Sequence, residues 1–379
     1  RNPVGVKNRR NVVLGQMKKY NYLDEVLIDS LKQQPLNLNY TPESHREGLA
    51  TYFREFLRAH MKTWINDENN RKPDGSKYNL NTDGLKIYTT INYSMQEMAE
   101  SAVKSHIPRL QKEFFEQNKT LDDSIAPFRE LTSGAVDTLL RISMRRSERW
   151  RKMKYDLKKN DEEIEESFYV PKEMTVFSWA GEIDTTMTPL DSMKYYKSFF
   201  RPGMMSMDPT NGYIKAWVGG MNYRHFQYDM VKKGKRQIGS TFKPFVYAAA
   251  IDQLKLSPCD TFPDSQFCIE KNKFGNVEQW CPKNSGDKYG RTRTLKNALA
   301  NSVNTVTARL MDRIGPRTVV KLAKDLGIEQ RILPVPSIAL GTPDLSVYEM
   351  VAAYSTFANK GVYTQPVFID RIEDKNGTT

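Results

Sequence analysis

Apolar residues recur at helical spacing in the first part of the chain. In residues 1–35 they return every three or four positions, which predicts two short helices. A polar stretch then precedes residues 49–64, "LATYFREFLRAHMKTW", whose pattern predicts an amphipathic helix. Residues 66–84 are rich in Asn, Asp and Gly and are typical of a loop.

The central part of the chain mixes strand-like and helix-like patterns. β-Branched and aromatic residues in 85–91, "LKIYTTI", predict a strand, and residues 95–117 predict a long helix. We expect one or two charged helices over 130–168. Residues 174–200 predict short strands followed by a helix that begins at Asp191.

The pattern changes at Gly203. Residues 203–220, "GMMSMDPTNGYIKAWVGG", predict a strand, a turn and a second strand, because Asp, Pro, Asn and Gly gather in the middle. In the second strand, alternation places Ile214, Ala216 and Val218 on one face, and it places Tyr213, Lys215 and Trp217 on the other.

The remaining chain adds helices and a last strand. An apolar run follows residue 240, and helical patterns cover 292–300, 302–315 and 317–327. Residues 361–374, "GVYTQPVFIDRIED", return to a strand pattern. A hairpin, a helical region and a final strand in this order predict an α+β fold.

Composition limits the classes of function. The chain has 379 residues, of which 39% are apolar and 27% charged, so two or three folded domains are expected. No apolar run reaches the roughly 18 residues of a membrane span, and the start at Arg1 suggests a piece of a longer protein. The net charge of +12 suits an anionic partner or a solvated surface. Because no nucleic-acid-binding motif occurs, we expect no nucleic acid partner.

Cysteine and histidine spacing gives no sign of a metal site. The three cysteines form no CxxC pair and the four histidines lie far apart, so neither a metal nor another cofactor is expected. Cys268 and Cys281 flank a short polar segment and could form a disulfide, but two free thiols remain equally open. Cys259 has no clear partner in the sequence.

The segment "GSTFKPFVYAAAI" carries candidate chemistry. Ser240 and Lys243 are three residues apart, which places them on one face if a helix begins near Ser240. Pro244 supports a helix start here, because proline is tolerated in the first turn. Burial would lower the pKa of Lys243, and a neutral amine can take a proton from a nucleophilic serine. The simpler alternative is an ordinary helix N-cap with an exposed lysine.

A second polar motif follows the first. Ser302 could relay a proton and the amide of Asn304 could bind a peptide substrate. Alternatively, Ser302 is a plain N-cap for a helix that ends at Ile314. Each motif alone is weak, but their order and spacing together are more specific.

With these motifs the chain resembles the class A penicillin-binding proteins. S-x-x-K followed by S-x-N is a signature of penicillin-binding proteins and serine β-lactamases. The resemblance extends to "RQIGSTFKPFVYAAAID", "MSMDPTNGYIKAWVGG", "TLKNALANSVNT" and "LGTPDLSVYEMVAAYSTFANKGVYTQP". "NPVGVKNRRNVVLGQM" is similar to the end of the glycosyltransferase domain that precedes the transpeptidase in that class.

The resemblance implies a role for each motif residue. Ser240 would attack the D-Ala-D-Ala carbonyl to form an acyl-enzyme, and Lys243 would be its general base. Ser302 would pass the proton to the leaving amine, and Asn304 would both complete the site and hold the substrate peptide. Peptidoglycan stem peptides, a lipid-linked precursor and β-lactam antibiotics are the implied ligands.

The resemblance also implies an arrangement of domains. Residues 1–35 would end a glycosyltransferase domain, and 36–200 would be a linker region with a charged helical insertion near 115–168. Residues 201–379 would be the first part of a penicillin-binding-protein-like transpeptidase domain, because the Lys-Thr/Ser-Gly motif of the family does not occur here. Anchoring in the inner membrane by a missing segment, and a catalytic part in the periplasm, are further expectations.

Two alternatives remain open. A serine β-lactamase or β-lactam sensor shares the S-x-x-K motif, although the glycosyltransferase-like segment argues against a small stand-alone enzyme. A non-catalytic scaffold could bind other cell-wall synthesis proteins through the 115–168 segment. Intact Ser240, Lys243, Ser302 and Asn304 argue against the scaffold.

Overall fold

The computed structural model describes residues 3–36, 45–121, 126–128 and 130–378 and divides into two compact units. In the first unit, α1 (Pro3–Lys19) packs beside α2 (Glu25–Gln33), as the periodicity predicts. Arg10 of α1 donates to the carbonyl oxygens of Lys32 and Gln34, at 3.0 and 2.9 Å. Arg10 thus donates to carbonyls at the end of α2 that have no hydrogen-bond partner within the helix.

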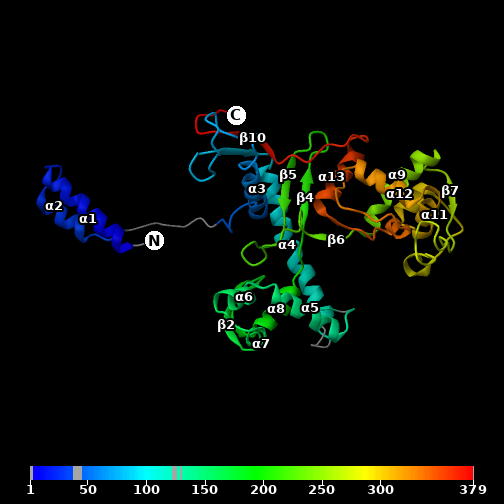
Figure 1. The fold of residues 1–379 in the computed structure, drawn as a ribbon, viewed down its shortest axis with the longest axis horizontal. Helices are drawn as coiled ribbons and strands as arrows, with labels where there is room; N and C mark the ends of the chain where they lie inside the picture. Colours follow the sequence, from blue (N-terminus) through cyan, green and yellow to red (C-terminus); the bar gives the residue numbers. More distant parts are fainter. Residues whose placement is uncertain (1–2, 37–44, 122–125, 129, 379) are drawn as a thin grey trace. The chain divides into compact units, whose positions relative to one another are not determined.

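In the described part of the second unit, which begins at Arg46, the strands form five antiparallel pairs. The pairs are β1 (Lys86–Thr89) with β10 (Ile369–Glu373), β2 (Lys172–Ser178) with β3 (Gly181–Met187), β4 (Met204–Met207) with β5 (Ile214–Val218), β6 (Lys235–Gln237) with β9 (Asp344–Ser346), and β7 (Thr261–Pro263) with β8 (Thr292–Thr294). Figure 1 shows the β4–β5 pair beside α4 (Tyr93–Asn118). The predicted strand at 85–91 is confirmed as β1, and its partner is the strand predicted at the end of the chain. The fold is therefore mixed α+β, as predicted.

Helices cover both faces of the predicted hairpin. Ala216 and Val218 of β5 pack in one cluster with residues of α4 (Tyr93–Asn118). Trp217 packs in another cluster with Phe53 of α3 (Thr51–Trp64) and is fully buried. The sequence predicts the hairpin, but Ile214 packs in the Trp217 cluster rather than with Ala216 and Val218, beside an irregularity in the β4–β5 register, so both faces are buried.

A polar contact fixes α4 against this hairpin. The side chain of Gln96 is completely buried and pairs with the backbone of Trp217 in both directions. Its Nε2 donates to the Trp217 carbonyl at 2.9 Å, and its Oε1 accepts from the Trp217 N–H at 2.7 Å. The amide therefore satisfies strand groups that would otherwise be buried without a partner.

The segment between α4 and the hairpin is more divided than its charge pattern predicts. Residues 130–168 contain α5 (Ser133–Arg145), α6 (Glu148–Arg151), a π-helical turn (Lys152–Asp156) and α7 (Asp161–Glu166). Ser147 and Asn160 cause the divisions, because each caps a new helix by accepting a backbone N–H.

A small core holds this segment together. It consists of Met144, Trp150, Ile164 and Phe168, all buried. The following helix α8 (Pro189–Lys197) contributes Leu190 and Met193, and it begins two residues before the predicted Asp191 because Thr188 is its N-cap. The segment is thus a folded body with its own core.

The largest core surrounds α9 (Lys243–Leu254). Its apolar residues pack against α10 (Leu295–Ala300), α11 (Asn304–Ile314), α12 (Pro316–Asp325) and a 3₁₀ helix (Pro336–Leu340). Helix α13 (Val347–Ala358) lies against strand β4. Phe242, Phe245 and Val246 are fully buried in the α9 core, so the segment after Ser240 is anchored on its apolar side.

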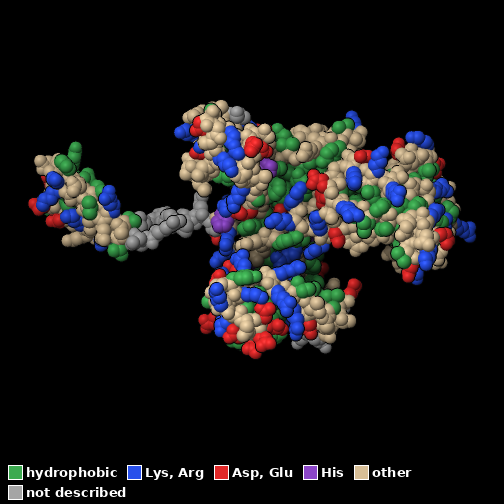
Figure 2. Space-filling view, viewed as in Figure 1, with side chains coloured by type: hydrophobic (Ala, Val, Ile, Leu, Met, Phe, Trp, Pro, Cys, Tyr) green, Lys and Arg blue, Asp and Glu red, His purple; other side chains and the backbone are tan. Residues whose placement is uncertain are grey.

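Charged side chains are spread over the visible face of the second unit, with lysine and arginine beside aspartate and glutamate (Figure 2). Several of them form exposed ion pairs, including Lys154 with Asp161 and Lys159 with Glu163. In the described part of the chain, no helix is long and apolar enough to cross a membrane. Among the same residues, no group of histidine, cysteine or acidic side chains could hold a metal ion.

Candidate active site

The Ser240 segment does not start as an α-helix. Gly239–Phe242 form a 3₁₀ turn, and α9 begins at Lys243. Ser240 is exposed, whereas only 1% of Lys243 is accessible to solvent. Ser240 makes no capping hydrogen bond, so the simple alternative of an N-cap with an exposed lysine is wrong.

Backbone contacts from later segments hold this turn. The Gly239 N–H donates to the carbonyl of Gly341 at 2.9 Å, and Tyr354 of α13 donates its hydroxyl to the carbonyl of Thr241 at 2.6 Å. Gly341 has a φ of +73°, and a Cβ there would overlap the Gly239 carbonyl. Glycine at this position therefore allows the two backbone segments to touch.

Lys243 joins the first motif to the second. Its Nζ donates to the Ser302 carbonyl at 2.5 Å, to the Ser302 hydroxyl at 2.9 Å and to the Asn304 Oδ1 at 2.6 Å. Burial lowers the pKa of Lys243 to about 8. A substantial fraction of this amine is therefore neutral in mildly basic solution, and a neutral amine can accept a proton.

The structure differs from the predicted Ser240–Lys243 contact. In the described part of the chain, the Ser240 hydroxyl makes no hydrogen bond, and all three donors of a protonated Lys243 point to the second motif. The backbone N–H of Lys243 donates to the Ser240 carbonyl, but the Ser240 hydroxyl is not paired with the Lys243 amine. Its exposed oxygen is accessible to a ligand.

The second motif is held in a special backbone conformation. Ser302 has a φ of +53°, a region that non-glycine residues seldom occupy, and it does not cap α11. Such conformations persist only where the surroundings fix them, and they gather at functional sites. Asn304 is the first residue of α11, and its Nδ2 donates to the Lys283 carbonyl at 2.7 Å. One N–H of this amide remains for a ligand.

Residues between the two motifs also reach the site, and the sequence analysis missed them. Lys283 and Asn284 both contact Asn304, after a loop closed by the disulfide Cys268–Cys281. Of the two states left open for these cysteines, the structure has the disulfide, and Cys259 is free and exposed. The short stretch "PKNSG" has no pattern that distinguishes it from an ordinary loop.

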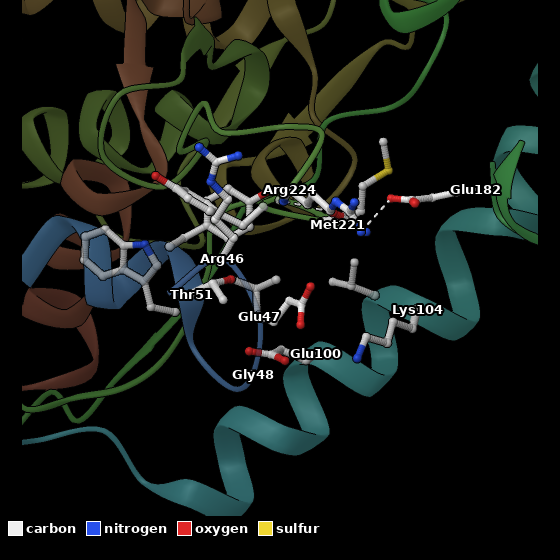
Figure 3. Close-up of a pocket in the computed structure, with 16 residues that line it drawn as sticks. Arg46, Glu47, Gly48, Thr51, Glu100, Lys104, Glu182, Met221 and Arg224 are labelled. Atoms are coloured by element: carbon white, nitrogen blue, oxygen red, sulfur yellow. Dashed lines mark hydrogen bonds and ion pairs between the residues drawn. The ribbon is translucent and has the colours of Figure 1, made fainter. Parts of the chain in front are cut away.

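Several hollows in the described part of the chain lie outside this cluster. An apolar groove beside Thr241 is lined partly by Met350, Val351 and Tyr354 of α13. A second cavity, of about 260 Å³, lies elsewhere, and its walls combine acidic and basic side chains (Figure 3). There, Arg224 pairs with Glu182 at 3.1 Å. None of Ser240, Lys243, Ser302 and Asn304 lines that cavity.

Comparisons with known proteins match two family models to the chain. The family described as "Penicillin-binding protein middle domain" matches residues 123–200, and "Penicillin binding protein transpeptidase domain" matches residues 203–379. The latter range contains both motifs.

Similar proteins and a similar structure come from several bacteria. Penicillin-binding protein 1A of Aquifex aeolicus is 26% identical over 99% of this chain and 49% of its own length. The Escherichia coli protein of the same name is 25% identical over 97% of this chain and 45% of its own length. The chain thus spans about half the length of the curated relatives it matches. The crystal structure of penicillin-binding protein 1A from Haemophilus influenzae has a similar fold, with a TM-score of 0.61, 22% identity, and coverage of 98% of this chain and 55% of that one.

Proposed function

Because the chain belongs to the class A penicillin-binding proteins, we propose that it is a serine D,D-transpeptidase that acts through Ser240. One observation carries the proposal: a buried lysine of lowered pKa lies three residues after an exposed serine and holds the second motif. This arrangement supports a nucleophile with an adjacent base.

The first half of the reaction forms an acyl-enzyme. Ser240 Oγ attacks the carbonyl carbon of the penultimate D-Ala, and neutral Lys243 takes the hydroxyl proton. The C–N bond then breaks, and the terminal D-Ala leaves as a free amine. The Ser302 hydroxyl, 2.9 Å from Lys243 Nζ, relays the proton to that amine. The remaining N–H of Asn304 holds the substrate peptide.

The second half transfers the acyl group. The amine of a neighbouring stem peptide attacks the acyl carbon, the C–O bond to Ser240 breaks, and the proton that the amine gives up passes through Lys243 to Ser240 Oγ. A new peptide bond cross-links two strands of the cell wall. A β-lactam would acylate Ser240 in the same way and remain attached.

The activity of the whole protein is part of the proposal. An upstream domain, of which residues 1–35 form the end, would polymerise glycan strands from a lipid-linked precursor. Residues 36–200 would link it to a transpeptidase domain that begins near 201. The protein would be anchored in the inner membrane with its catalytic part in the periplasm, where other cell-wall synthesis proteins could bind the 115–168 segment.

Labelling with a fluorescent penicillin tests the proposal in the full-length protein. We expect stable covalent label on the natural protein and none on Ser240→Ala, provided that both have the same thermal unfolding midpoint. Ser105→Ala, at an exposed serine of α4, is the control and should label normally.

Two other results would contradict the transpeptidase function and indicate a different one. A folded natural protein that takes no label would contradict the transpeptidase and favour a scaffold. Label that forms on Ser240 and is rapidly released as hydrolysed penicillin would indicate a β-lactamase.

A further inference from the structure

A buried carboxylate close to the second motif has no part in the proposed reaction. Asp264 follows strand β7 and its side chain is fully buried. Burial alone would raise its pKa, but hydrogen bonds from Arg293, Thr305, Asn284 and Gly290 lower it to about 2. Asp264 is therefore a carboxylate at neutral pH, with four donors arranged around it.

Two of these donors, Thr305 and Asn284, are next to or in contact with Asn304 of the second motif. The Thr305 hydroxyl donates to Asp264 Oδ1 at 2.8 Å, and Thr305 is the second residue of α11. The Asn284 Nδ2 donates to the same oxygen at 2.7 Å. On the other side of the carboxylate, Arg293 donates to Oδ2 at 2.6 Å. The carboxylate thus fixes both the loop that contains Asn284 and the start of α11.

Asn284 supplies a helix cap that the local sequence lacks. The N-cap position of α11 is Val303, which has no side-chain acceptor. The Asn284 Oδ1 instead accepts the backbone N–H of Asn304 at 3.0 Å and of Thr305 at 3.2 Å. A helix begins with N–H groups that have no partner inside the helix, so a side chain from a distant loop satisfies two of them.

The same loop also orients the Asn304 side chain. The carbonyl of Lys283, next to Asn284, accepts the Asn304 Nδ2 at 2.7 Å. This contact turns the Asn304 Oδ1 toward Lys243 Nζ, which donates to it at 2.6 Å. A continuous path of hydrogen bonds therefore runs from Asp264 through Asn284 and Asn304 to Lys243.

We propose that Asp264 and Asn284 are positioning residues for the acylation step: they fix the start of α11 and the Lys283 carbonyl, and thereby hold Asn304 against Lys243. Neither residue touches the substrate. The inference rests on the proposed function, because positioning matters only if Lys243 acts on Ser240. A small misplacement of catalytic groups costs roughly 100-fold in rate, which sets the scale of the expected effect.

The test uses variants of the full-length protein and a matched control. Asn284→Ala removes the cap and the contact with Asp264. Asn276→Ala is the control, because Asn276 lies in the disulfide-closed loop that directly precedes Asn284 and donates two hydrogen bonds, to the carbonyls of Glu270 and Glu278, without reaching α11. Both variants are first compared by thermal unfolding.

Acylation kinetics provide the first readout. We expect Asn284→Ala to lower the first-order acylation rate constant by roughly 10- to 100-fold, with little change in the affinity for penicillin before the bond forms. Asn276→Ala should retain the natural rate constant. A purely structural role for Asn284 would instead lower the stability of Asn284→Ala and leave the rate constant of its folded fraction unchanged.

Exchanging the two side chains provides a rescue. Asn284→Asp alone places two carboxylates together, and Asp264→Asn alone leaves Arg293 facing an amide. The double variant restores one carboxylate and one amide across the contact that is 2.7 Å long in the natural protein. We expect it to recover part of the rate constant that each single variant loses.

The outcomes separate this inference from the proposed function. Natural protein that labels, together with folded Asn284→Ala that labels at the natural rate, would overturn the positioning role and leave the transpeptidase intact. Natural protein that takes no label would overturn the transpeptidase, and with it a role in acylation. Hydrogen exchange at the Asn304 and Thr305 amides then decides whether the cap exists, since Asn284→Ala should accelerate it and Asn276→Ala should not.

Discussion

The α9 region and the α5–α8 region use polar residues in opposite ways. Around α9, Lys243 and Asp264 are buried and their charged groups are hydrogen-bonded to neighbours. Around α5–α8, the core is a few apolar side chains, and charges such as Lys154 and Asp161 pair at the surface. Burial makes a polar contact costly to break, whereas an exposed ion pair is exchanged for water at little cost.

The two regions should therefore respond differently to substitution. Changes in the α9 region should affect the chemistry, whereas changes in the α5–α8 region should affect only packing. In the α9 region, replacing a polar side chain leaves a buried hydrogen-bonding partner unsatisfied. In the α5–α8 region a changed charge should be tolerated, and only the core side chains should matter. Four variants test this contrast, from the largest expected effect to the smallest.

Lys243→Ala should have the largest effect. It removes the proposed base, which lowers the acylation rate by about 10²- to 10⁴-fold. In the natural protein, the neutral form of Lys243 increases as pH rises, so the acylation rate should rise through a midpoint near its pKa of about 8. The variant should lose this pH dependence, which stopped-flow labelling between pH 6 and 9 would detect.

Lys232→Ala is the matched control for that variant. Burial also lowers the pKa of Lys232, whose Nζ lies 3.4 Å from the centre of the Tyr348 ring. Its replacement removes a partly buried lysine without touching either motif. If Lys232→Ala loses the pH dependence as well, the titration does not belong to Lys243.

Phe168→Ala should break the α5–α8 core. The side chain is fully buried, and such a truncation costs about 3–5 kcal/mol. We expect faster hydrogen exchange across α5–α8 and no change in the acylation rate of the folded protein. Loss of labelling in a variant whose α9 region still resists exchange would mean that the two regions are coupled.

Gly341→Ala should act on the turn that carries Ser240. A Cβ at this position would overlap the Gly239 carbonyl, and the φ of +73° is itself unfavourable for alanine. Gly361→Ala is the control, since Gly361 has a φ of +88° but nothing within 4 Å of a Cβ. Left-handed backbone alone costs about 1–2 kcal/mol.

The two glycine variants should therefore affect different properties of the protein. Gly361→Ala should lower the unfolding free energy by about that amount and label normally. Gly341→Ala should lower it further and also slow acylation, because Ser240 must move. Equal stability and equal labelling of the two would show that the Ser240 turn tolerates the displacement.

Lys154→Ala should have the smallest effect. The Lys154–Asp161 pair, 2.9 Å apart, is exposed, and such pairs contribute about 0.5 kcal/mol or less. Urea unfolding at low and high salt should differ little from that of the natural protein. A clearly larger loss would show that the charges of this segment support its fold.

Local patterns in the sequence determined much of the secondary structure, although the short strands β6, β7, β8 and β9 had no such pattern. Apolar periodicity identified α1, α2, α3 and α4, and turn residues identified the β4–β5 hairpin. These elements depend on neighbours a few residues away, so a single sequence contains the signal. The divisions at Ser147 and Asn160 were also readable, because both are helix-capping residues, but the charge pattern concealed them.

The sequence also determined which residues were candidates for chemistry, through the spacing of Ser240, Lys243, Ser302 and Asn304. It could not determine their contacts. Lys243 reaches Ser302 across 59 residues, and Asp264 reaches Thr305 across 41. Such contacts depend on the path of the whole chain, so the tertiary structure alone paired Lys243 with the second motif, rather than with Ser240, and brought Asn284 to the start of α11. Periodicity is a property of neighbouring residues, whereas the geometry of a site is set by packing between distant segments.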